Sequence, residues 1–330
     1  MTFAAQDAAS WLANPRATRE TLEAFGLATK HRLGQNFLVE DNIIRKIIRL
    51  AELTSDDVVL EVGPGLGTLT VAMLDYVRAV CSIEADRELE GVLATTCKEP
   101  YQDSFVLCMG DALKATPQLV GDAYASLGVF ADTQGKEASG ALIGPNKFVS
   151  NLPYQVAATL ILLFFQEFTT LEQAIVMVQA EVADRISAKP GTKAYGAYTA
   201  KLALYAQVSG RFEVAPGNFM PPPRVNSAVV RLERAPMTDP SGTSVLTSEQ
   251  LAWVARVIDA AFAQRRKTIR NSMGASGFKK DTLERALLAA HIEPTVRAEA
   301  LGVKDFVRLA MALAEGGAYG EETAFVHGRR

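Results

Sequence analysis

The chain has few of the residues on which metal sites and nucleophilic catalysis most often depend. Its 330 residues include only three histidines and three cysteines, Cys81, Cys97 and Cys108. The cysteines are dispersed, odd in number and without a CxxC spacing, which argues against a disulfide framework and a zinc site and is typical of a reducing compartment. We therefore expect no metal site and no histidine-based catalysis.

Long apolar runs are also missing. The longest, residues 156–165, is too short to cross a bilayer and is followed by Gln166 and Glu167. The first residues show no charged segment followed by an apolar one, as a secretory signal would. With 48% hydrophobic residues and a mean hydropathy of +0.09, the chain is expected to be a globular protein of the cytoplasm without a membrane segment.

Charge is distributed unevenly along the chain. The formal net charge is −3, but residues 185–297 hold more lysine and arginine than aspartate and glutamate, and the rest is acidic. A basic region in an acidic protein is compatible with a polyanionic partner such as nucleic acid. A solvated helical surface explains the same asymmetry, so charge alone leaves both interpretations open.

A predicted strand, a glycine loop and a predicted helix follow one another near the start of the chain. Residues 58–62 (VVLEV) predict a buried parallel strand, and the loop after them contains Gly63, Gly65 and Gly67. Glycines let a backbone approach a ligand closely, and this loop precedes a helix N-terminus. The GxGxG spacing is neither the dinucleotide GxGxxG nor a Walker A sequence. The pattern predicts the nucleotide-binding turn of a doubly wound α/β sheet, with a purely structural turn as the alternative.

Acidic residues end the next two predicted strands. Glu84 ends the strand at 79–83, about twenty residues past the glycines, where a carboxylate can accept hydrogen bonds from ribose hydroxyls. Asp111 follows the strand at 105–109 and can accept a hydrogen bond from an adenine amino group. Asp86 is the better candidate for a helix cap. Because strand ends share one edge of such a sheet, the glycine loop and the two carboxylates predict a nucleoside cofactor.

Two further stretches combine polar and aromatic groups. Residues 151–154 (Asn-Leu-Pro-Tyr) follow a predicted strand at 147–150 and precede an apolar helix. They offer an amide oxygen, a rigid turn and an aromatic ring. Phe219 lies in a loop stiffened by three consecutive prolines, where it is either a core anchor or a ligand contact.

The remaining pattern predicts two domains. An α/β domain covers residues 1–234, a linker covers 235–247, a helical domain covers 248–316 and a tail covers 317–330. Residues 117–146 are polar and glycine-rich, which predicts a surface insertion in the first domain. A helix is expected over 195–206 and a short strand over 212–214.

Short motifs occur in order along residues 30–310, and together they point to a family. They are GQNFL (34–38), EVGPGLG (61–67), IEAD (83–86), GDA (110–112), NLPY (151–154), FMPPPRVNS (219–227) and FAQRRK (262–267). This set resembles the KsgA/RsmA-type ribosomal RNA adenine N6,N6-dimethyltransferases. The chain departs from the family pattern at Ala85, in the insertion at 117–146 and in the tail after Gly316.

The resemblance implies a Rossmann-like S-adenosylmethionine-dependent methyltransferase sheet with a smaller all-helical C-terminal domain. It implies S-adenosylmethionine as the cofactor, with contacts at Asn36, Leu38, Gly63, Gly65, Gly67, Glu84, Asp111 and Asn151. The implied substrate is small-subunit rRNA within a pre-assembled small ribosomal subunit, acted on by a monomer during ribosome biogenesis. Two adjacent adenosines of a hairpin loop near the 3′ end would each receive two methyl groups. RNA contacts are expected at Lys30, Arg32, Arg224, Arg265, Arg266, Lys267 and Arg270.

For the implied reaction, the residues of the turn can be given roles. Adenine N6 is a poor nucleophile because its lone pair is delocalised into the ring. We expect the Asn151 side-chain oxygen and the Leu152 carbonyl to accept the two N6 hydrogens, and Pro153 to fix the turn. Tyr154 and Phe219 are expected to cover the two faces of the base. No general base is needed before attack, so catalysis consists mainly of positioning.

The sequence pattern is also compatible with other functions. An antibiotic-resistance dimethyltransferase that acts on large-subunit rRNA shares the glycine loop and an Asn-x-Pro-Tyr turn. DNA adenine and protein glutamine methyltransferases usually carry two prolines in that turn, whereas position 152 is leucine. A further hypothesis does not require catalysis. The protein would be a ribosome-assembly checkpoint that mainly binds immature small subunits.

Overall fold

The computed structural model describes residues 9–27, 36–130 and 142–318. Within these ranges the chain forms two compact units. The first contains the residues up to Ala183 together with Val208–Arg234, and the second contains Asp184–Gln207 and the residues from Ala235 on. The second unit thus includes a segment that the sequence pattern groups with the first domain, and the domain boundaries stay a prediction.

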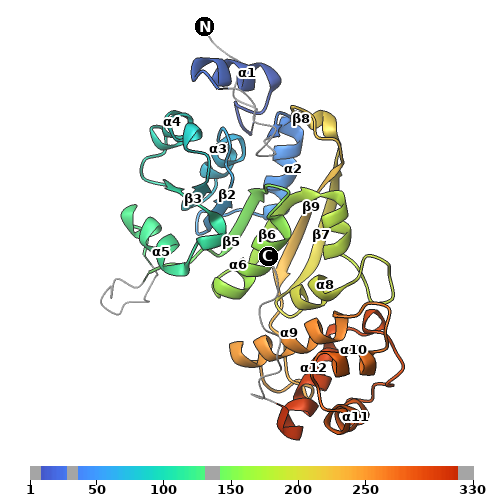
Figure 1. Cartoon of the computed structure of the whole chain (residues 1–330). Coiled ribbons are helices and arrows are strands. Elements are labelled where there is room, and N and C mark those ends of the chain that lie inside the picture. Colours follow the sequence, from blue (N-terminus) through green and yellow to red (C-terminus); the bar gives the residue numbers. More distant parts are fainter. Residues whose placement is uncertain (1–8, 28–35, 131–141, 319–330) are drawn as a thin grey trace. The chain divides into compact units, whose positions relative to one another are not determined.

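A seven-stranded sheet, counted over the described residues, forms the centre of the first unit (Figure 1). Its strand order is β4-β3-β2-β5-β6-β9-β7. In chain order these strands are β2 (Val58–Val62), β3 (Ala79–Glu84), β4 (Phe105–Met109), β5 (Lys147–Asn151), β6 (Gln173–Gln179), β7 (Ala206–Val214) and β9 (Ser227–Arg234). Strands β2 to β6 pair in parallel, and β9 runs antiparallel to β6. The predicted Rossmann-like sheet is confirmed.

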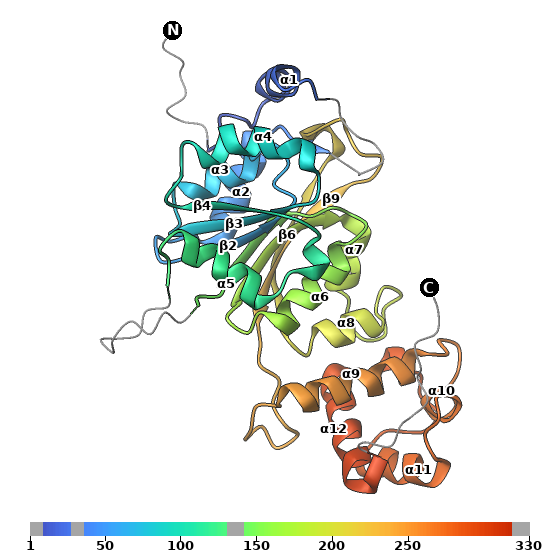
Figure 2. The same cartoon turned by 60° about the vertical axis from the view of Figure 1, so that its left-hand side comes forward.

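Helices cover both faces of this sheet (Figure 2). On one face, α2 and α3 share an apolar core with Val59, Val80 and Val149. On the other face α6 packs against β5, with the Phe148 and Phe164 ring centroids 4.9 Å apart. The following helices and short strands outside the large sheet belong to this unit, except that α7 continues past Ala183 into the second unit. The bounds are α1 (Pro15–Ala24), β1 (Phe37–Leu38), α2 (Asp41–Ala51), α3 (Thr68–Leu74), η2 (Arg87–Leu89), α4 (Glu90–Leu93), η3 (Ala94–Lys98), η4 (Ala112–Lys114), α5 (Pro117–Ser126), α6 (Ala157–Glu167), α7 (Ala180–Ile186), η5 (Pro216–Asn218) and β8 (Phe219–Met220).

Helix α5 corrects the expectation of a surface insertion over residues 117–146. Thr116 caps this helix by accepting a hydrogen bond from the Leu119 amide, and Pro117 occupies its first turn. Tyr124 is fully buried, and its hydroxyl donates to the Val59 carbonyl at 2.8 Å. The first part of the expected insertion is therefore a core helix of the sheet. Residues 131–141 lie outside the described ranges.

The second unit is built from helices around its own apolar core. They are α8 (Ala197–Leu202), α9 (Ser248–Phe262), α10 (Ile269–Ala275), α11 (Lys280–Ala289), η6 (Ala298–Ala300), α12 (Val303–Leu313) and η7 (Ala314–Ala318). The Trp253 indole donates to the Ala310 carbonyl at 2.8 Å, which joins α9 to α12. Tyr195 is buried and donates to the Leu301 carbonyl at 2.9 Å.

The segments on either side of α8 differ from the sequence prediction. The expected helix over 195–206 is shorter, and β7 already begins at Ala206. The predicted linker is structured too, since Thr238 pairs with Val245 and Leu246 is buried. No helix within the described ranges is both long and apolar enough to cross a membrane.

Candidate functional site

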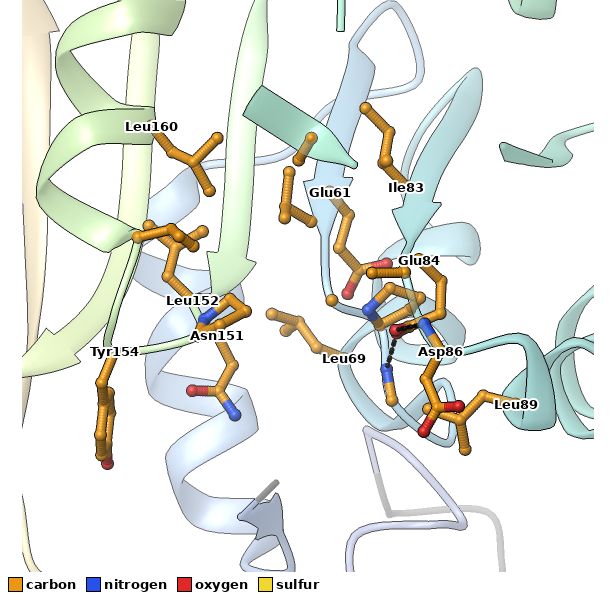
Figure 3. A pocket seen from close by; sticks show the side chains of 18 of the residues that line it. Glu61, Leu69, Ile83, Glu84, Asp86, Leu89, Asn151, Leu152, Tyr154 and Leu160 are labelled. Carbon is orange, nitrogen blue, oxygen red and sulfur yellow. Dashed lines mark hydrogen bonds between the residues drawn. The ribbon is translucent and has the colours of Figure 1, made fainter. Parts of the chain in front are cut away.

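A cavity of about 390 Å³ opens at the carboxyl edge of the sheet in the first unit (Figure 3). Its lining comes from β1, the glycine loop, the ends of β3 and β4, and the turn after β5. The predicted cofactor residues that line it are Asn36, Leu38, Gly63, Gly65, Glu84, Asp111 and Asn151, together with Leu152, Pro153 and Tyr154 of the turn. In Figure 3, Asn151 and Tyr154 lie on one side of the cavity, and Glu61, Glu84 and Asp86 lie on the other.

The strand order explains why the cavity forms here. The chain starts the parallel sheet at β2, adds β3 and β4 on one side, and then returns to place β5 on the other side. The paired residues of β2 and β5 are Val59–Lys147 and Leu60–Phe148. Past these pairs the Ser150 hydroxyl connects the strands by donating to the Val62 carbonyl at 2.6 Å. A reversal of strand order of this kind is where open α/β sheets bind ligands.

Within the glycine loop, two glycines face the cavity and the third does not. Gly63 has a φ of +69°, and a Cβ there would lie 3.4 Å from the Pro153 ring. The loop and the turn after β5 therefore lie close together. Gly67 is not among the lining residues, and a Cβ there would lie 2.5 Å from the Cys97 sulfur. In this structure Gly67 provides room for a neighbouring segment, and its predicted cofactor contact stays a prediction.

The Glu84 side chain is buried and bonded to two backbone amides. It accepts hydrogen bonds from the Asp86 amide at 2.9 Å and from the Gly65 amide at 3.4 Å. Burial raises the pKa of Glu84. Asp86 accepts from the Glu88 amide, which confirms the predicted cap. The Glu84 carboxylate is thus fixed between the glycine loop and the end of β3.

Asp111 follows β4 and caps the short helix η4. Its Oδ1 accepts a hydrogen bond from the Leu113 amide at 3.0 Å, and its side chain is exposed at the edge of the cavity. Leu113, at 39% exposure, lies beside it in the lining. The carboxylate and the apolar side chain together form a surface suited to a flat heterocycle with an amino group.

The turn after β5 has hydrogen-bond acceptors available at the cavity. The Asn151 Nδ2 donates to the Asn36 carbonyl at 3.5 Å, and the Leu152 amide donates to the Met177 carbonyl at 3.1 Å. No residue in the described ranges donates to the Asn151 Oδ1 or the Leu152 carbonyl. The Pro153 carbonyl accepts from the Val156 amide, which starts the approach to α6.

Phe219 differs from its predicted role. In β8 it pairs with Leu38 of β1, and this pairing holds Asn36 and Leu38 at the cavity. The Phe219 side chain is only 3% exposed, belongs to the core and does not line the cavity. Of the two roles considered for Phe219, core anchor and ligand contact, the structure shows the core anchor. Stacking on a base would require the Phe219 ring to become exposed.

Glu61 is a cavity residue that the sequence pattern does not single out as a functional group. It is 1% exposed, and its Oε2 accepts hydrogen bonds from the Thr70 and Ser82 hydroxyls, both at 2.7 Å. Burial raises the pKa of Glu61 to about 7, against the lowering effect of the two hydroxyls. The signal in the sequence is an acidic residue inside the otherwise apolar run VVLEV, where an unpaired charge is costly.

The residues predicted to contact RNA are distributed over both units. Arg224 is exposed in the first unit, and Arg265, Arg266, Lys267 and Arg270 are exposed in the second. Arg265 also donates to the Lys193 carbonyl at 2.9 Å. Lys30 and Arg32 lie outside the described residues. Over the ranges that the structure covers, no cluster of side chains is suited to hold a metal ion.

Comparison with known proteins links this chain to a family. A family model described as "Ribosomal RNA adenine dimethylase" matches residues 26–315. A protein of Acidothermus cellulolyticus named "Ribosomal RNA small subunit methyltransferase A" is 38% identical over 297 residues, covering 89% of this chain and 92% of that protein. The protein of the same name from Kineococcus radiotolerans is 38% identical over 307 residues, covering 92% and 93%.

Solved structures are similar in fold. A dimethyladenosine transferase from Plasmodium falciparum aligns with a TM-score of 0.65 at 24% identity, covering 85% of this chain and 98% of that one. The 23S rRNA methyltransferase ErmE aligns with a TM-score of 0.59 at 24% identity, covering 84% and 100%. At this identity the two likenesses concern the fold alone.

Proposed function

Because the chain belongs to the ribosomal RNA adenine dimethylase family, we propose that it dimethylates two adjacent adenosines in the 3′-terminal hairpin loop of small-subunit rRNA. S-adenosylmethionine is the methyl donor, and four methyl groups are transferred in all. The observation that carries the proposal is that the Asn151–Tyr154 turn and the glycine loop, Glu84 and Asp111 open into one cavity.

The side chains around this cavity fit the proposed cofactor. Glu84 lies at the end of β3, where it can accept hydrogen bonds from ribose hydroxyls, and Asp111 lies where it can accept one from an adenine amino group. The backbone of the loop at Gly63 and Gly65 is open to the cavity, and Leu113 offers an apolar surface. When bound, S-adenosylmethionine supplies a methyl group on a sulfonium, which is already a good electrophile.

The turn supplies the groups that orient the adenine. The Asn151 Oδ1 and the Leu152 carbonyl accept the two N6 hydrogens, which favours a nitrogen lone pair directed at the methyl group. The Pro153 ring packs near Gly63, so it keeps the acceptors in place relative to the cofactor loop. The Tyr154 ring stacks on the base. Nearly all of the catalysis is then orientation, because the proton on N6 leaves easily only after the methyl group has been added.

Finer features of the substrate follow from the family resemblance. We propose that the substrate is a pre-assembled small ribosomal subunit and that the enzyme acts as a cytoplasmic monomer. The names of the relatives at 38% identity support the small-subunit assignment. The similarity to ErmE, which is named a 23S rRNA methyltransferase, concerns the fold alone. Large-subunit rRNA is therefore the alternative substrate that an experiment should compare.

Tritiated methyl transfer tests the proposal directly. Purified protein is incubated with labelled S-adenosylmethionine and with undermethylated small subunits or large subunits, and the modified nucleoside is identified after digestion. We expect N6,N6-dimethyladenosine from the small subunit. Label in the large subunit alone would replace the proposal with the resistance-type activity. If a variant without transferase activity still rescued assembly of small subunits in cells, binding would be the larger role.

A further inference from the structure

A hydrogen bond links the catalytic turn to a strand that does not line the cavity. The Tyr154 and Ser227 hydroxyl oxygens are 2.7 Å apart, and either can be the donor. Tyr154 lines the cavity, whereas Ser227 is fully buried and is absent from the lining. Both residues belong to the first unit.

The sheet explains why Ser227 can reach the turn. It is the first residue of β9, which runs antiparallel to β6, and it pairs with Gln179 at the end of β6. Because β5 and β6 are parallel, the beginning of β9 lies at the same edge of the sheet as the end of β5. The Ala180 amide also donates to the Asn226 carbonyl at 2.9 Å, so the backbone on both sides of Ser227 is fixed.

The Tyr154–Ser227 hydrogen bond fixes the orientation of the Tyr154 ring, which the turn itself does not. The turn and the start of α6 fix the Tyr154 backbone, but the ring can still rotate about its side-chain torsions. Figure 3 shows the ring nearly edge-on beside the Asn151 amide, with both side chains extending the same way from the end of β5. A buried serine hydroxyl without a partner is costly, so Ser227 favours the one ring orientation that satisfies it.

We propose that Ser227 is a positioning residue for methyl transfer. Its hydroxyl holds the Tyr154 ring in the plane in which the target adenine stacks beside Asn151. The inference rests on the proposed function, since it assumes that Tyr154 stacks on the base. Because Ser227 does not line the cavity, its loss changes the placement of the base and leaves cofactor binding unchanged.

A double-mutant cycle separates this role from a merely structural one. Ser227→Ala, Tyr154→Phe and the double variant are compared with the unaltered protein in single-turnover methyl transfer to undermethylated small subunits. Each single change removes the same hydrogen bond, so each should slow transfer by roughly 3- to 10-fold, the usual effect of one such bond. The double variant should be no slower than the slower single one. Effects that multiply, or no effect in either single variant, would overturn the proposal.

Two further measurements make the result specific. The dissociation constant of S-adenosylmethionine should stay within about twofold in all three variants, and a larger change would mean that the cavity itself is distorted. With 2-aminopurine at a target position, the quenching that accompanies stacking should weaken in Ser227→Ala; unchanged quenching counts against the proposal. Ser126→Ala removes a hydroxyl that donates to the Ala123 carbonyl at the end of α5 and should leave rate and quenching unchanged.

The design also distinguishes failure of this inference from failure of the proposed function. If the unaltered protein transfers no methyl group to the small subunit, the function itself is wrong. If it transfers methyl groups normally and the cycle is multiplicative, the function stands and only the role of Ser227 is lost.

Discussion

Asn151 is the residue on which the proposed chemistry most depends. Its Oδ1 receives no hydrogen bond within the described ranges, while its Nδ2 donates to the Asn36 carbonyl. The amide is therefore oriented by the protein and still has an acceptor to offer. A hydrogen-bond acceptor that is already oriented needs no rearrangement during the reaction. Most of its effect on the rate comes from this preorganisation.

Replacing Asn151 with alanine should abolish most of the activity. We expect methyl transfer in single-turnover assays to fall by about 10²-fold or more, the usual loss for one oriented hydrogen-bonding group. Cofactor affinity, measured by calorimetry, should change far less. Asn42→Ala, at an exposed position on α2, serves as the control and should keep full activity. Transfer by Asn151→Ala at the unaltered rate would rule out the mechanism.

Glu61 should make the stability of the protein depend on pH. Its pKa is about 7 in the folded protein, raised from 4.5 chiefly by burial. The folded state thus holds a proton that the unfolded state loses, so the free energy of unfolding contributed by this group falls as pH rises from about 4.5 to about 7. Above about pH 7 this stabilising contribution of Glu61 is fully lost, and below about pH 4.5 it is fully present. The size is on the order of 3 kcal/mol at most.

The variant Glu61→Gln tests this expectation. An amide oxygen can still accept from the Thr70 and Ser82 hydroxyls, while the titrating group is removed. Urea unfolding between pH 4.5 and pH 8 should therefore show the variant gaining stability over the unaltered protein as pH rises. If the difference in unfolding free energy between the two proteins stays constant over this pH range, the expected titration of Glu61 is wrong.

At the scale of elements, the sequence predicts the strand, loop and helix around the glycines but not what each glycine does. The GxGxG spacing predicts a tight turn. The apolar residues before it predict a buried strand. The contact of Gly67 with Cys97 and Thr96 joins segments thirty residues apart in the chain. A local pattern carries no information about such a contact, because it depends on how the segment at 94–98 packs.

The same reasoning explains two other differences. Residues 117–126 contain glycine and polar residues, yet they form a core helix because its Val120 and Tyr124 side chains are buried. Phe219 is aromatic and lies in a proline-rich loop, yet it is in the core because β8 pairs with β1. For Phe219, tertiary contacts decide between two roles that the sequence leaves open, and for residues 117–126 they override the predicted surface insertion. Strand ends, by contrast, share one edge in any parallel sheet, so the positions of Glu84, Asp111 and Asn151 could be predicted.

Gly67→Ala should weaken the packing between α3 and η3. The φ of +89° is unfavourable for alanine, and its Cβ would overlap the Cys97 sulfur at 2.5 Å. We expect the free energy of unfolding to fall by about 2–4 kcal/mol, measured by urea denaturation. Gly217→Ala is the matched control, since a Cβ there meets nothing within 4 Å. Equal stability of the two variants would contradict the proposed close approach.

At the scale of the whole molecule, the two units differ in what they offer to RNA. The first contains the cavity, and the second carries a turn after α9 with Arg265, Arg266 and Lys267 exposed. The chain as a whole has a net charge of −3, so its average charge repels RNA. Binding of a polyanion must then depend on local basic surfaces, and the strength of such binding falls with salt as counterions return to the phosphates.

Reversing charge at Arg266 and Lys267 should therefore weaken RNA binding and reduce its salt dependence. Arg265 is left unchanged because it also donates to the Lys193 carbonyl, so its replacement would remove a hydrogen bond as well as a charge. For Arg266→Glu/Lys267→Glu, the slope of log affinity against log salt should decrease by roughly 1.5 in magnitude if both residues contact phosphates. Filter binding to small subunits over a range of salt concentrations measures the slope.

The control for this experiment must carry the same change in net charge. Arg78→Glu/Lys98→Glu reverses two exposed cations of the first unit and alters the total charge equally. If long-range repulsion alone matters, the two double variants will lose affinity to the same extent. A loss of slope in Arg266→Glu/Lys267→Glu that the control lacks assigns the contact to the turn after α9. An equal slope in both would make the basic turn a solvated surface.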